Sequence, residues 1–264
     1  MSLYLGNNKV SMKSGYTATG LKEFLENGGK FAYSNYTDLT GILKYEDTEN
    51  VTSMDYMFYS CEYLTDIPIL NTSKVTRMRY MFNSCKKLIS INQLDTSNVI
   101  DMYSMFGYCN KLSSIPQLDT SKVTDMTYMF QNCDYLITIP QLDTSKVTNM
   151  QYMFFNCYAL KIIPNLDVSK VTSMDYMFYN CSNLTEIHMT GMQSSFDIHD
   201  STKFTRDALV EILNNLATVT RTKRLTMGST NLEKLTDEDK AIATNKGWTL
   251  AWKYLNLKQD ILSR

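Results

Sequence analysis

The six cysteines of this 264-residue chain follow one another at a constant interval of 24 residues, from Cys61 to Cys181. Valine keeps the same interval from Val51 to Val171, and so do two methionines, a phenylalanine, a leucine and an isoleucine. One unit reads V-T-x-M-x-Y-M-F-x-x-C-x-x-L-x-x-I-P-x-L-D-T-S-K, and six copies cover residues 51 to about 194. Such a period is typical of stacked repeats, and it argues against a single folded-back enzyme core over this stretch.

Each unit carries its apolar residues in a pattern that predicts local structure. The first five apolar positions have the spacing of one face of a helical or 3₁₀-rich turn, and in the first unit they are Val51, Met54, Met57, Phe58 and Cys61. Residues 64–67 then indicate a short strand, and the Asp and Ser of the L-D-T-S segment turn the chain. One unit cannot close a core, but stacked units can. We therefore expect an α/β repeat fold, a solenoid of six 24-residue units with a cap at each end.

The period divides the chain into three parts: residues 1–50 as an N-terminal cap, 51–194 as the repeats, and 195–264 as a C-terminal helix–strand cap with a tail. Residues 3–11 predict a hairpin, and residues 21–27 predict a helix that Gly28 stops. Residues 33–42 align with 58–67 at an offset of 25, which places Tyr36 where a repeat has its cysteine. We interpret that segment as a degenerate first turn.

The C-terminal part has a different pattern of elements. Thr205 is a suitable N-cap for a helix whose apolar stripe consists of Leu209, Ile212, Leu213 and Leu216. Residues 224–228 predict a strand, Thr236 opens a second helix that Gly247 closes, and residues 248–252 predict a last strand. Residues 253–264 are expected to form a loose helix. Since terminal repeats are characteristically atypical, we interpret this part as a cap.

Charge and motifs exclude several classes of function. The chain has 26 Lys and Arg against 27 Asp and Glu, whereas nucleic-acid binding needs a clustered basic surface. No apolar run approaches the roughly 18 residues that span a bilayer. There are two histidines, and no Gly-rich phosphate loop, H-E-x-x-H or G-x-S-x-G occurs. We therefore expect no enzyme, no cofactor, no nucleic-acid partner and no membrane span.

The repeated cysteines and aspartates are expected to be structural. Equivalent positions in a stack point the same way, so a buried column of free thiols is favoured over disulfides, and Cu(I) binding is the minor alternative. The aspartates of the turns are expected to accept backbone N–H groups, with lysines three residues on as partial partners, and a row of Ca²⁺ ions is the alternative. These aspartates are Asp95, Asp119, Asp143 and Asp167.

Two sets of side chains are candidates for ligand binding. The first is a tyrosine ladder that lies off the inward stripe and is interrupted at Ser104, and its members are Tyr56, Tyr80, Tyr128, Tyr152 and Tyr176. It is either a self-stacked aromatic row or a strip that binds sugar or protein. The second set occupies the predicted strands, and its members are Thr65, Asp66, Ser90, Ser113, Ser114, Thr138, Lys161 and Glu186. These side chains are small and weakly charged, so any affinity through them is expected to be modest or multivalent.

The unit M-F-x-x-C-x-x-L-x-x-I-P, as in residues 129–140, resembles the BspA-like, treponemal class of leucine-rich repeat. The L-D-T-S-K-V-T-x-M-x-Y-M-F core is similar to its variant in surface proteins of gut and oral bacteria and mycoplasmas. The C-terminal segments FTRDALVEILNNLATV and LTDEDKAIATNKGWTL also resemble the ending of such arrays. The resemblance implies a parallel, right-handed leucine-rich-repeat solenoid with short strands lining one face. It implies binding or adhesion and not catalysis.

From this we expect a non-catalytic protein that recognises a protein or glycan at a cell surface, as an adhesin of a host-associated bacterium does. Its location would be the cell surface or outside the cell. The start, MSLYLGNNKV, contains no secretory signal. The alternative is therefore a structural or host-recognition component of a bacteriophage or prophage virion, and a third hypothesis is a cytoplasmic scaffold.

Overall fold

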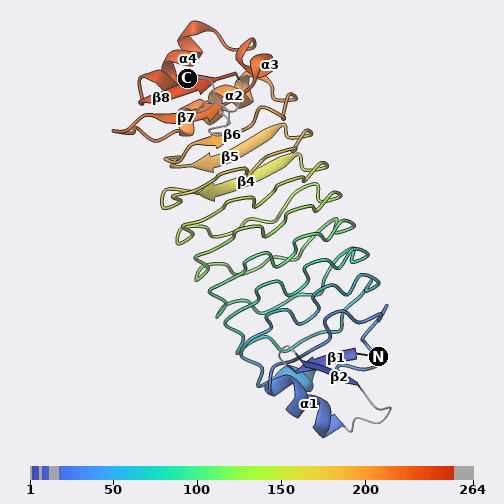
Figure 1. Ribbon diagram of the computed structural model, residues 1–264. Coiled ribbons are helices and arrows are strands. Elements are labelled where there is room, and N and C mark those ends of the chain that lie inside the picture. Colours follow the sequence, from blue (N-terminus) through green and yellow to red (C-terminus); the bar gives the residue numbers. More distant parts are fainter. Residues whose placement is uncertain (1, 6–7, 12–17, 253–264) are drawn as a thin grey trace, which may run out of the picture.

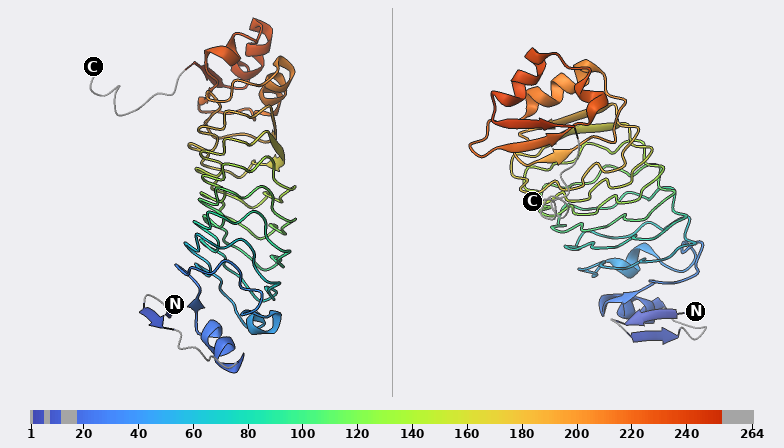
Figure 2. Two further views of the ribbon diagram at one scale, coloured as in Figure 1. Left: turned by 90° about the vertical axis from the view of Figure 1, so that its right-hand side faces the viewer. Right: turned by 45° about the horizontal axis from the view of Figure 1, so that its top comes forward.

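Residues 24 positions apart in the repeats lie side by side in neighbouring coils, where a coil is one repeat of the sequence as it appears in space. One row of isolated parallel bridges runs through Ser53, Arg77, Asp101, Asp125, Asn149 and Ser173. The computed structural model describes residues 2–5, 8–11 and 18–252, and in it the coils form an elongated stack (Figures 1 and 2). The six coils are 51–74, 75–98, 99–122, 123–146, 147–170 and 171–194.

The interior of the stack consists of columns of identical side chains. Seven phenylalanines lie almost parallel, with neighbouring ring centroids 5.4 to 5.9 Å apart and interplanar angles of 13° or less, and they are Phe31, Phe58, Phe82, Phe106, Phe130, Phe154 and Phe178. The valine, methionine and leucine columns beside them are buried as well. Fully burying one such side chain contributes about 1.5–3 kcal/mol, so the columns hold the coils together.

The segment predicted to be a helical or 3₁₀-rich turn is a series of tight turns in which the amide of residue i+3 donates to the carbonyl of residue i, so the bonds are of the 3₁₀ type but no continuous helix forms. The Met57 amide donates to the Met54 carbonyl within the coil, whereas the Tyr56 amide donates across the stack to the Arg79 carbonyl. A helix would keep all these bonds within the segment. Tyr56 has φ 60°, the left-handed value that the third residue of a type II turn requires. The pattern was misleading because tandem turns also place apolar residues three or four positions apart.

The segment that corresponds to residues 64–67 of the first repeat is part of a regular strand only in the last two coils, 147–170 and 171–194. There β4 (Ile162–Asp167) and β5 (Glu186–Thr190) pair in parallel. Elsewhere these segments make single contacts, such as the bond from the Thr65 amide to the Thr37 carbonyl. The prediction of a strand in every unit is therefore wrong.

The N-terminal unit combines a small antiparallel sheet with a helix. Its sheet has the order β2-β1-β3, and α1 is followed by Gly28 with φ 82°, as predicted. The predicted hairpin is confirmed by the pairing of β1 with β2, although its residues 6–7 lie outside the described part. The elements are β1 (Ser2–Leu5), β2 (Asn8–Ser11), α1 (Ala18–Glu26), β3 (Gly29–Lys30) and the 3₁₀ helix η1 (Tyr45–Thr48).

The degenerate first turn aligns differently from the sequence prediction. The ring of Phe31 stacks on Phe58, and the Ser34 hydroxyl lies 3.3 Å from the Cys61 thiol. Both pairs are 27 residues apart, so Ser34 rather than Tyr36 holds the place of the cysteine. The offset of 25 is wrong, because the chain between Ser34 and Cys61 contains three extra residues relative to a repeat.

The C-terminal unit continues the parallel arrangement with longer connections. Its sheet has the order β6-β7-β8, and both pairs are parallel. The predicted helices and caps are confirmed: Thr205 accepts the Ala208 amide, Thr236 and Asp239 form a capping box, and Gly247 has φ 84°. The elements are β6 (Phe196–Asp197), α2 (Arg206–Asn215), β7 (Lys223–Thr226), α3 (Ser229–Leu232), α4 (Asp237–Thr244) and β8 (Trp248–Ala251). The predicted helix at 253–264 lies outside the described residues.

Candidate functional site

The tyrosine ladder runs along the outside of the tight turns. Each member takes the left-handed position of its turn, with φ between 54° and 60°. Tyr56 stacks on Tyr80 with centroids 4.7 Å apart, and Tyr152 stacks on Tyr128 at 4.7 Å and on Tyr176 at 5.0 Å. Tyr56 is 38% exposed, and the other four are half-buried. The prediction that these side chains lie partly at the surface is therefore confirmed.

One coil departs from this pattern at four positions. In coil 99–122, Ser104 replaces the ladder tyrosine, and new tyrosines appear directly before it at Tyr103 and four residues after it at Tyr108. Gly107 replaces the residue that is Asn83 in the preceding coil and a glutamine in the next. The sequence prediction noted the break at Ser104 but missed the other three. A column-by-column comparison of the repeats would have found them.

The ring of Tyr103 leans across the gap in the ladder. Its centroid lies 5.1 Å from that of Tyr80 with an interplanar angle of 55°, and 5.6 Å from that of Tyr128 at 63°. The Arg79 guanidinium lies 5.0 Å from the centroid of the same ring. Burial and a hydrogen bond with the Tyr80 side chain raise the pKa of Tyr103 above its ordinary value. The phenol is therefore a neutral hydrogen-bonding group at physiological pH.

These substitutions leave a hollow of about 360 Å³ in the side of the stack, which we name the Ser104 hollow. Its lining is Tyr59, Tyr80, Asn83, Tyr103, Ser104, Tyr108, Tyr128 and Gln131. Asn83, which is 5% exposed, donates from Nδ2 to Ser104 Oγ at 2.8 Å, and Ser84 donates to Asn83 Oδ1 at 2.8 Å. The hollow thus combines aromatic rings with a hydrogen-bonded polar group and has no charged side chain in its lining.

The candidate residues of the predicted strands follow one another along the stack. All are exposed except Glu186, which is half-buried. Several of their hydroxyls already donate to backbone carbonyls of a neighbouring coil: Thr65 to Thr37, and Ser113 to Ile89. This leaves fewer free polar groups for a ligand on this row than around the Ser104 hollow.

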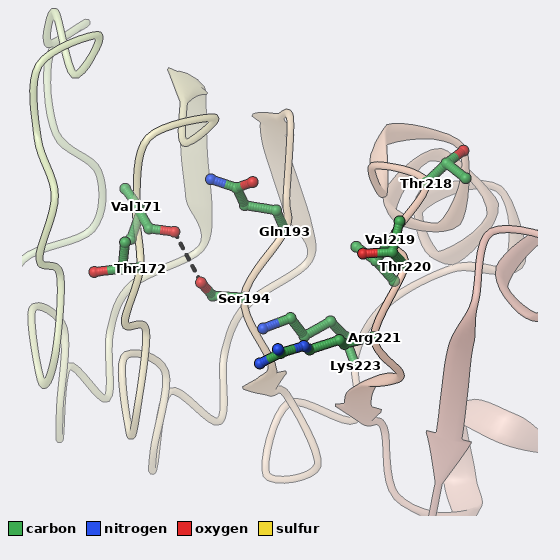
Figure 3. Close-up of a pocket in the computed structure, with 9 residues that line it drawn as sticks. All are labelled: Val171, Thr172, Gln193, Ser194, Thr218, Val219, Thr220, Arg221 and Lys223. Carbon is green, nitrogen blue, oxygen red and sulfur yellow. Dashed lines mark hydrogen bonds between the residues drawn. The ribbon is translucent and has the colours of Figure 1, made fainter.

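A second hollow, of about 390 Å³, lies where the last coil meets the C-terminal unit (Figure 3). Thr172 and Ser194 line it from the array, and residues 218–221 line it from the segment after α2. In Figure 3 the side chains of Arg221 and Lys223 extend toward Ser194. Its lining is positively charged, in contrast to that of the Ser104 hollow.

The two histidines both lie between carboxylates. His188 contacts Glu211 at 2.7 Å and Glu186 at 3.0 Å, and thereby joins β5 to α2. Hydrogen bonds to these carboxylates raise the pKa of His188, and the bond to Glu211 has the larger effect. The sequence pattern gives no sign of these contacts.

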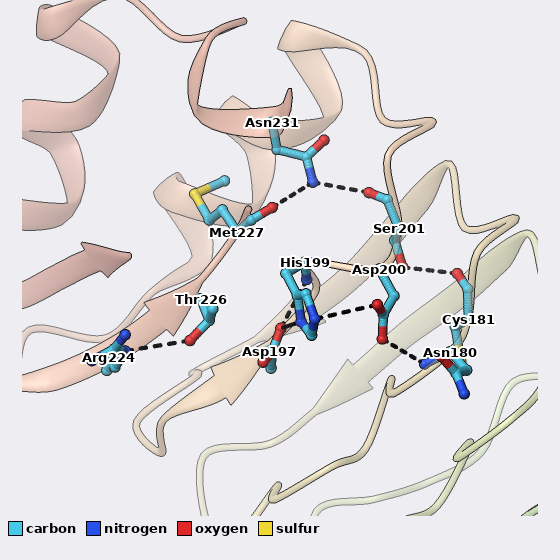
Figure 4. Close-up of polar contacts among 10 residues, drawn as sticks. All are labelled: Asn180, Cys181, Asp197, His199, Asp200, Ser201, Arg224, Thr226, Met227 and Asn231. Atoms are coloured by element: carbon cyan, nitrogen blue, oxygen red, sulfur yellow. Dashed lines mark hydrogen bonds and ion pairs between the residues drawn. The ribbon is translucent and has the colours of Figure 1, made fainter. Parts of the chain in front are cut away.

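His199 belongs to a polar joint between the array and the C-terminal unit (Figure 4). Its Nδ1 lies 2.6 Å from Asp197 Oδ1 and its Nε2 lies 3.2 Å from Asp200 Oδ1. Asp200 also accepts the Asn180 amide at 2.9 Å, which ties the joint to the last coil. The hydrogen bond to Asp197 is the main cause that raises the pKa of His199. The joint is a structural contact with its side chains paired to one another.

The repeated polar residues of the turns satisfy the backbone, as predicted. Asp143 Oδ1 accepts the Ser145 amide at 3.0 Å and the Ser145 hydroxyl at 2.7 Å. Hydrogen bonds from Ser121, with a smaller contribution from the charge of Lys122, lower the pKa of Asp119. The Lys122 Nζ itself donates to Asn98 Oδ1 of the preceding coil at 2.8 Å. Within the described ranges, no group of three or more His, Cys, Asp or Glu is arranged to hold a metal ion.

A family model described as "Mycoplasma protein of unknown function, DUF285" matches residues 29–136 and, in an overlapping second match, residues 109–208. Together the matches cover more than half of the chain, including all six coils. No curated protein sequence matches the chain. Across the part of the chain that the structure describes, no helix has both the length and the apolar character of a membrane span.

Proposed function

Because the chain belongs to the DUF285 family, whose description assigns no activity, we propose its function from its own side chains: it is a non-catalytic binding protein that recognises a protein or glycan at a cell surface. The partner binds along the tyrosine ladder. We further propose that the stack is a leucine-rich-repeat solenoid of the BspA-like class. The repeat motif and the lateral pairing at 24-residue intervals support that assignment.

The observation that carries the proposal is the ladder itself. A row of partly exposed rings presents large apolar faces and hydroxyls at a spacing fixed by the coils. Tyrosine loses little conformational entropy on binding, so it contributes well to contacts with proteins and sugars. The rings are held by stacking and by the backbone of the turns, and this preorganisation reduces the cost of association.

The cysteines and histidines are engaged within the fold, which supports a binding function over a catalytic one. The six thiols are free and buried, and both histidines are paired with carboxylates. Since a repeated row presents the same groups several times, the affinity of one contact is multiplied by simultaneous engagement of others. A polymeric or clustered partner, such as a mucin or an envelope polymer, is the kind of ligand that such a row serves.

The test is the retention of labelled protein on two panels, host mucins with epithelial matrix and intact bacterial cells. The double substitution Tyr128→Ala/Tyr152→Ala is expected to reduce retention at least tenfold. The matched control is Tyr135→Ala, which removes a tyrosine that is 53% exposed but lies outside the ladder. Retention on host material fits an adhesin, and retention on bacterial cells fits a phage component. Equal loss in the ladder and control variants, or no retention of the unaltered protein on either panel, would contradict the proposal.

A further inference from the structure

At the Ser104 hollow, four neighbouring positions of one coil depart together from the repeat pattern. We propose that it binds a single neutral pyranose ring of a saccharide, with aromatic rings against the sugar's C–H face and the Asn83–Ser104 pair on its hydroxyls. This inference rests on the proposed binding function and narrows the ligand to a glycan.

The walls of the hollow suit the apolar face of a sugar. Tyr80 and Tyr128 stand on either side of the missing ladder tyrosine, and Tyr103 is tilted by 55° and 63° to them, so it does not rebuild the stack. Tyr108, at 41% exposed, borders the hollow from the following turn. The faces of aromatic rings are apolar with a negative potential, and they attract the weakly positive C–H groups of a pyranose.

The polar groups of the hollow suit sugar hydroxyls. Ser104 Oγ accepts one bond from Asn83, at 2.8 Å, and retains its own O–H as a donor. The Asn83 amide has a second N–H, and the Gln131 amide lies at the rim. A hydroxyl both donates and accepts, so it can pair with either kind of group.

Gly107 is the residue that leaves room for this polar pair at the floor of the hollow, where Asn83 is 5% and Ser104 is 2% exposed. A Cβ at Gly107 would lie 2.5 Å from Ser104 Oγ and 2.6 Å from Asn83 Nδ2, both closer than atoms can pack. Gly107 is not among the glycines with positive φ, so the backbone conformation does not demand glycine there. The preceding and following coils carry Asn83 and Gln131 at the same position. The glycine at position 107 therefore provides space for the neighbouring side chains, and it is not required by the backbone conformation.

The volume of the hollow and the charge of its lining restrict the class of ligand further. A volume of about 360 Å³ lies at the small end of the range for small-molecule sites, which runs from about 300 to 1,000 Å³. The lining contains no Lys, Arg, Asp or Glu, and the Arg79 guanidinium beside the Tyr103 ring is paired with Asp101. A hexose or an N-acetylhexosamine thus fits better than a sialic or uronic acid.

The test uses the full chain and saturation-transfer NMR with galactose, glucose, N-acetylglucosamine and N-acetylneuraminic acid. We expect transfer to the ring protons of at least one neutral sugar and none to the acidic one. The key variant is Tyr103→Thr/Ser104→Tyr, which copies the Thr127–Tyr128 pair of the next coil and so fills the hollow with a side chain that the fold already accommodates. It is expected to weaken sugar binding at least tenfold, with a thermal midpoint close to that of the unaltered protein.

A second variant is the matched control. Tyr158→Ala removes a tyrosine that is 44% exposed and lies outside both the ladder and the lining of the hollow, so it is expected to leave sugar binding within twofold. Sugar binding that survives Tyr103→Thr/Ser104→Tyr, or that prefers the acidic sugar, would overturn the inference. Retention on mucin or cells without any sugar binding would overturn the inference and leave the proposed function standing. If the protein shows neither retention on mucin or cells nor sugar binding, both the inference and the proposed function are contradicted.

Discussion

The thiol of Cys133 donates a hydrogen bond to the carbonyl oxygen of Phe106, 27 residues earlier in the chain, with a sulfur–oxygen distance of 3.2 Å. The same bond joins each of the six cysteines to a phenylalanine of the preceding turn, with distances of 3.0 to 3.2 Å. The sequence predicts that these thiols are free and buried, but it does not reveal this bond. The cysteine column therefore serves as a set of small hydrogen-bond donors inside the core.

Native thiols are expected to resist alkylation. Burial raises the pKa of Cys109 to about 12, and the thiolate is the reactive form. Incubation with a thiol reagent at pH 8 should leave all six unmodified in the folded protein and modify all six in urea, as counted by mass spectrometry. Rapid modification of several cysteines without denaturant would contradict the buried column.

Removing one ring of the phenylalanine stack should lower the free energy of unfolding substantially. Phe130→Ala deletes a fully buried side chain with a stacked ring on either side, and changes of this kind destabilise by about 3–5 kcal/mol. The free energy of unfolding from urea titration measures the effect. The control, Tyr135→Ala, alters an exposed ring and should cost below about 1 kcal/mol. Similar values for the two variants would show that the stack is not the main core.

The joint at His199 should make stability depend on pH. Asp197 and Asp200 both face the ring and raise its pKa, so the folded state holds the proton more tightly than the unfolded chain does. The resulting stabilisation is complete below the unfolded pKa of about 6.5 and is lost as pH rises through the folded value.

His199→Gln should therefore lower the thermal midpoint more at pH 5.5 than at pH 8.5. His188→Gln provides the comparison, because the pKa of His188 is also raised, by Glu211 and Glu186. Both variants are expected to show the same sign of pH dependence. A larger loss at pH 8.5 would contradict the pairing seen at these two histidines.

Deleting residues 205–252 should expose the end of the stack and cause aggregation, because the stripe of α2 packs beside β5 and its residues Leu209, Ile212 and Leu213 are buried. Unpaired edges of stacked backbones promote association. Size-exclusion chromatography distinguishes a monomer from aggregates. Deletion of 123–146 is the matched control, since it removes one whole coil and preserves the lateral pairing. A soluble, cooperatively unfolding 205–252 deletion would contradict the role of this unit as a cap.

The spacing of the repeats is sufficient to predict which columns are buried, where the cap helices begin and which side chains reach the surface. It is not sufficient to predict the backbone of the turns. Helices and tandem turns share the spacing of Met54, Met57 and Phe58, and only the positive φ of Tyr56 distinguishes them. Tyrosine rarely adopts that conformation, so the sequence gives no cue.

The candidate site could be predicted only in part. The ladder follows from one column of the repeat, whereas the Ser104 hollow depends on four columns at once and on the close approach that a side chain at Gly107 would make to Asn83. The residue that occupies the cysteine position in the first turn, Ser34, was not predicted for a related reason. Three extra residues before Cys61 shift the alignment, and the matches of Leu39 to Leu64 and of Ile42 to Ile67 at an offset of 25 conceal the shift.

The pairing of residues at a fixed interval of 24 has a consequence for how genes of this type change. Residues 118–130 and 142–154 differ at only two positions, so misaligned recombination between such segments removes or adds one complete unit in frame. Every remaining residue then still meets an equivalent neighbour, and the product folds. Variants of this array are therefore expected to differ in length by whole units, with the lateral contacts between coils unchanged.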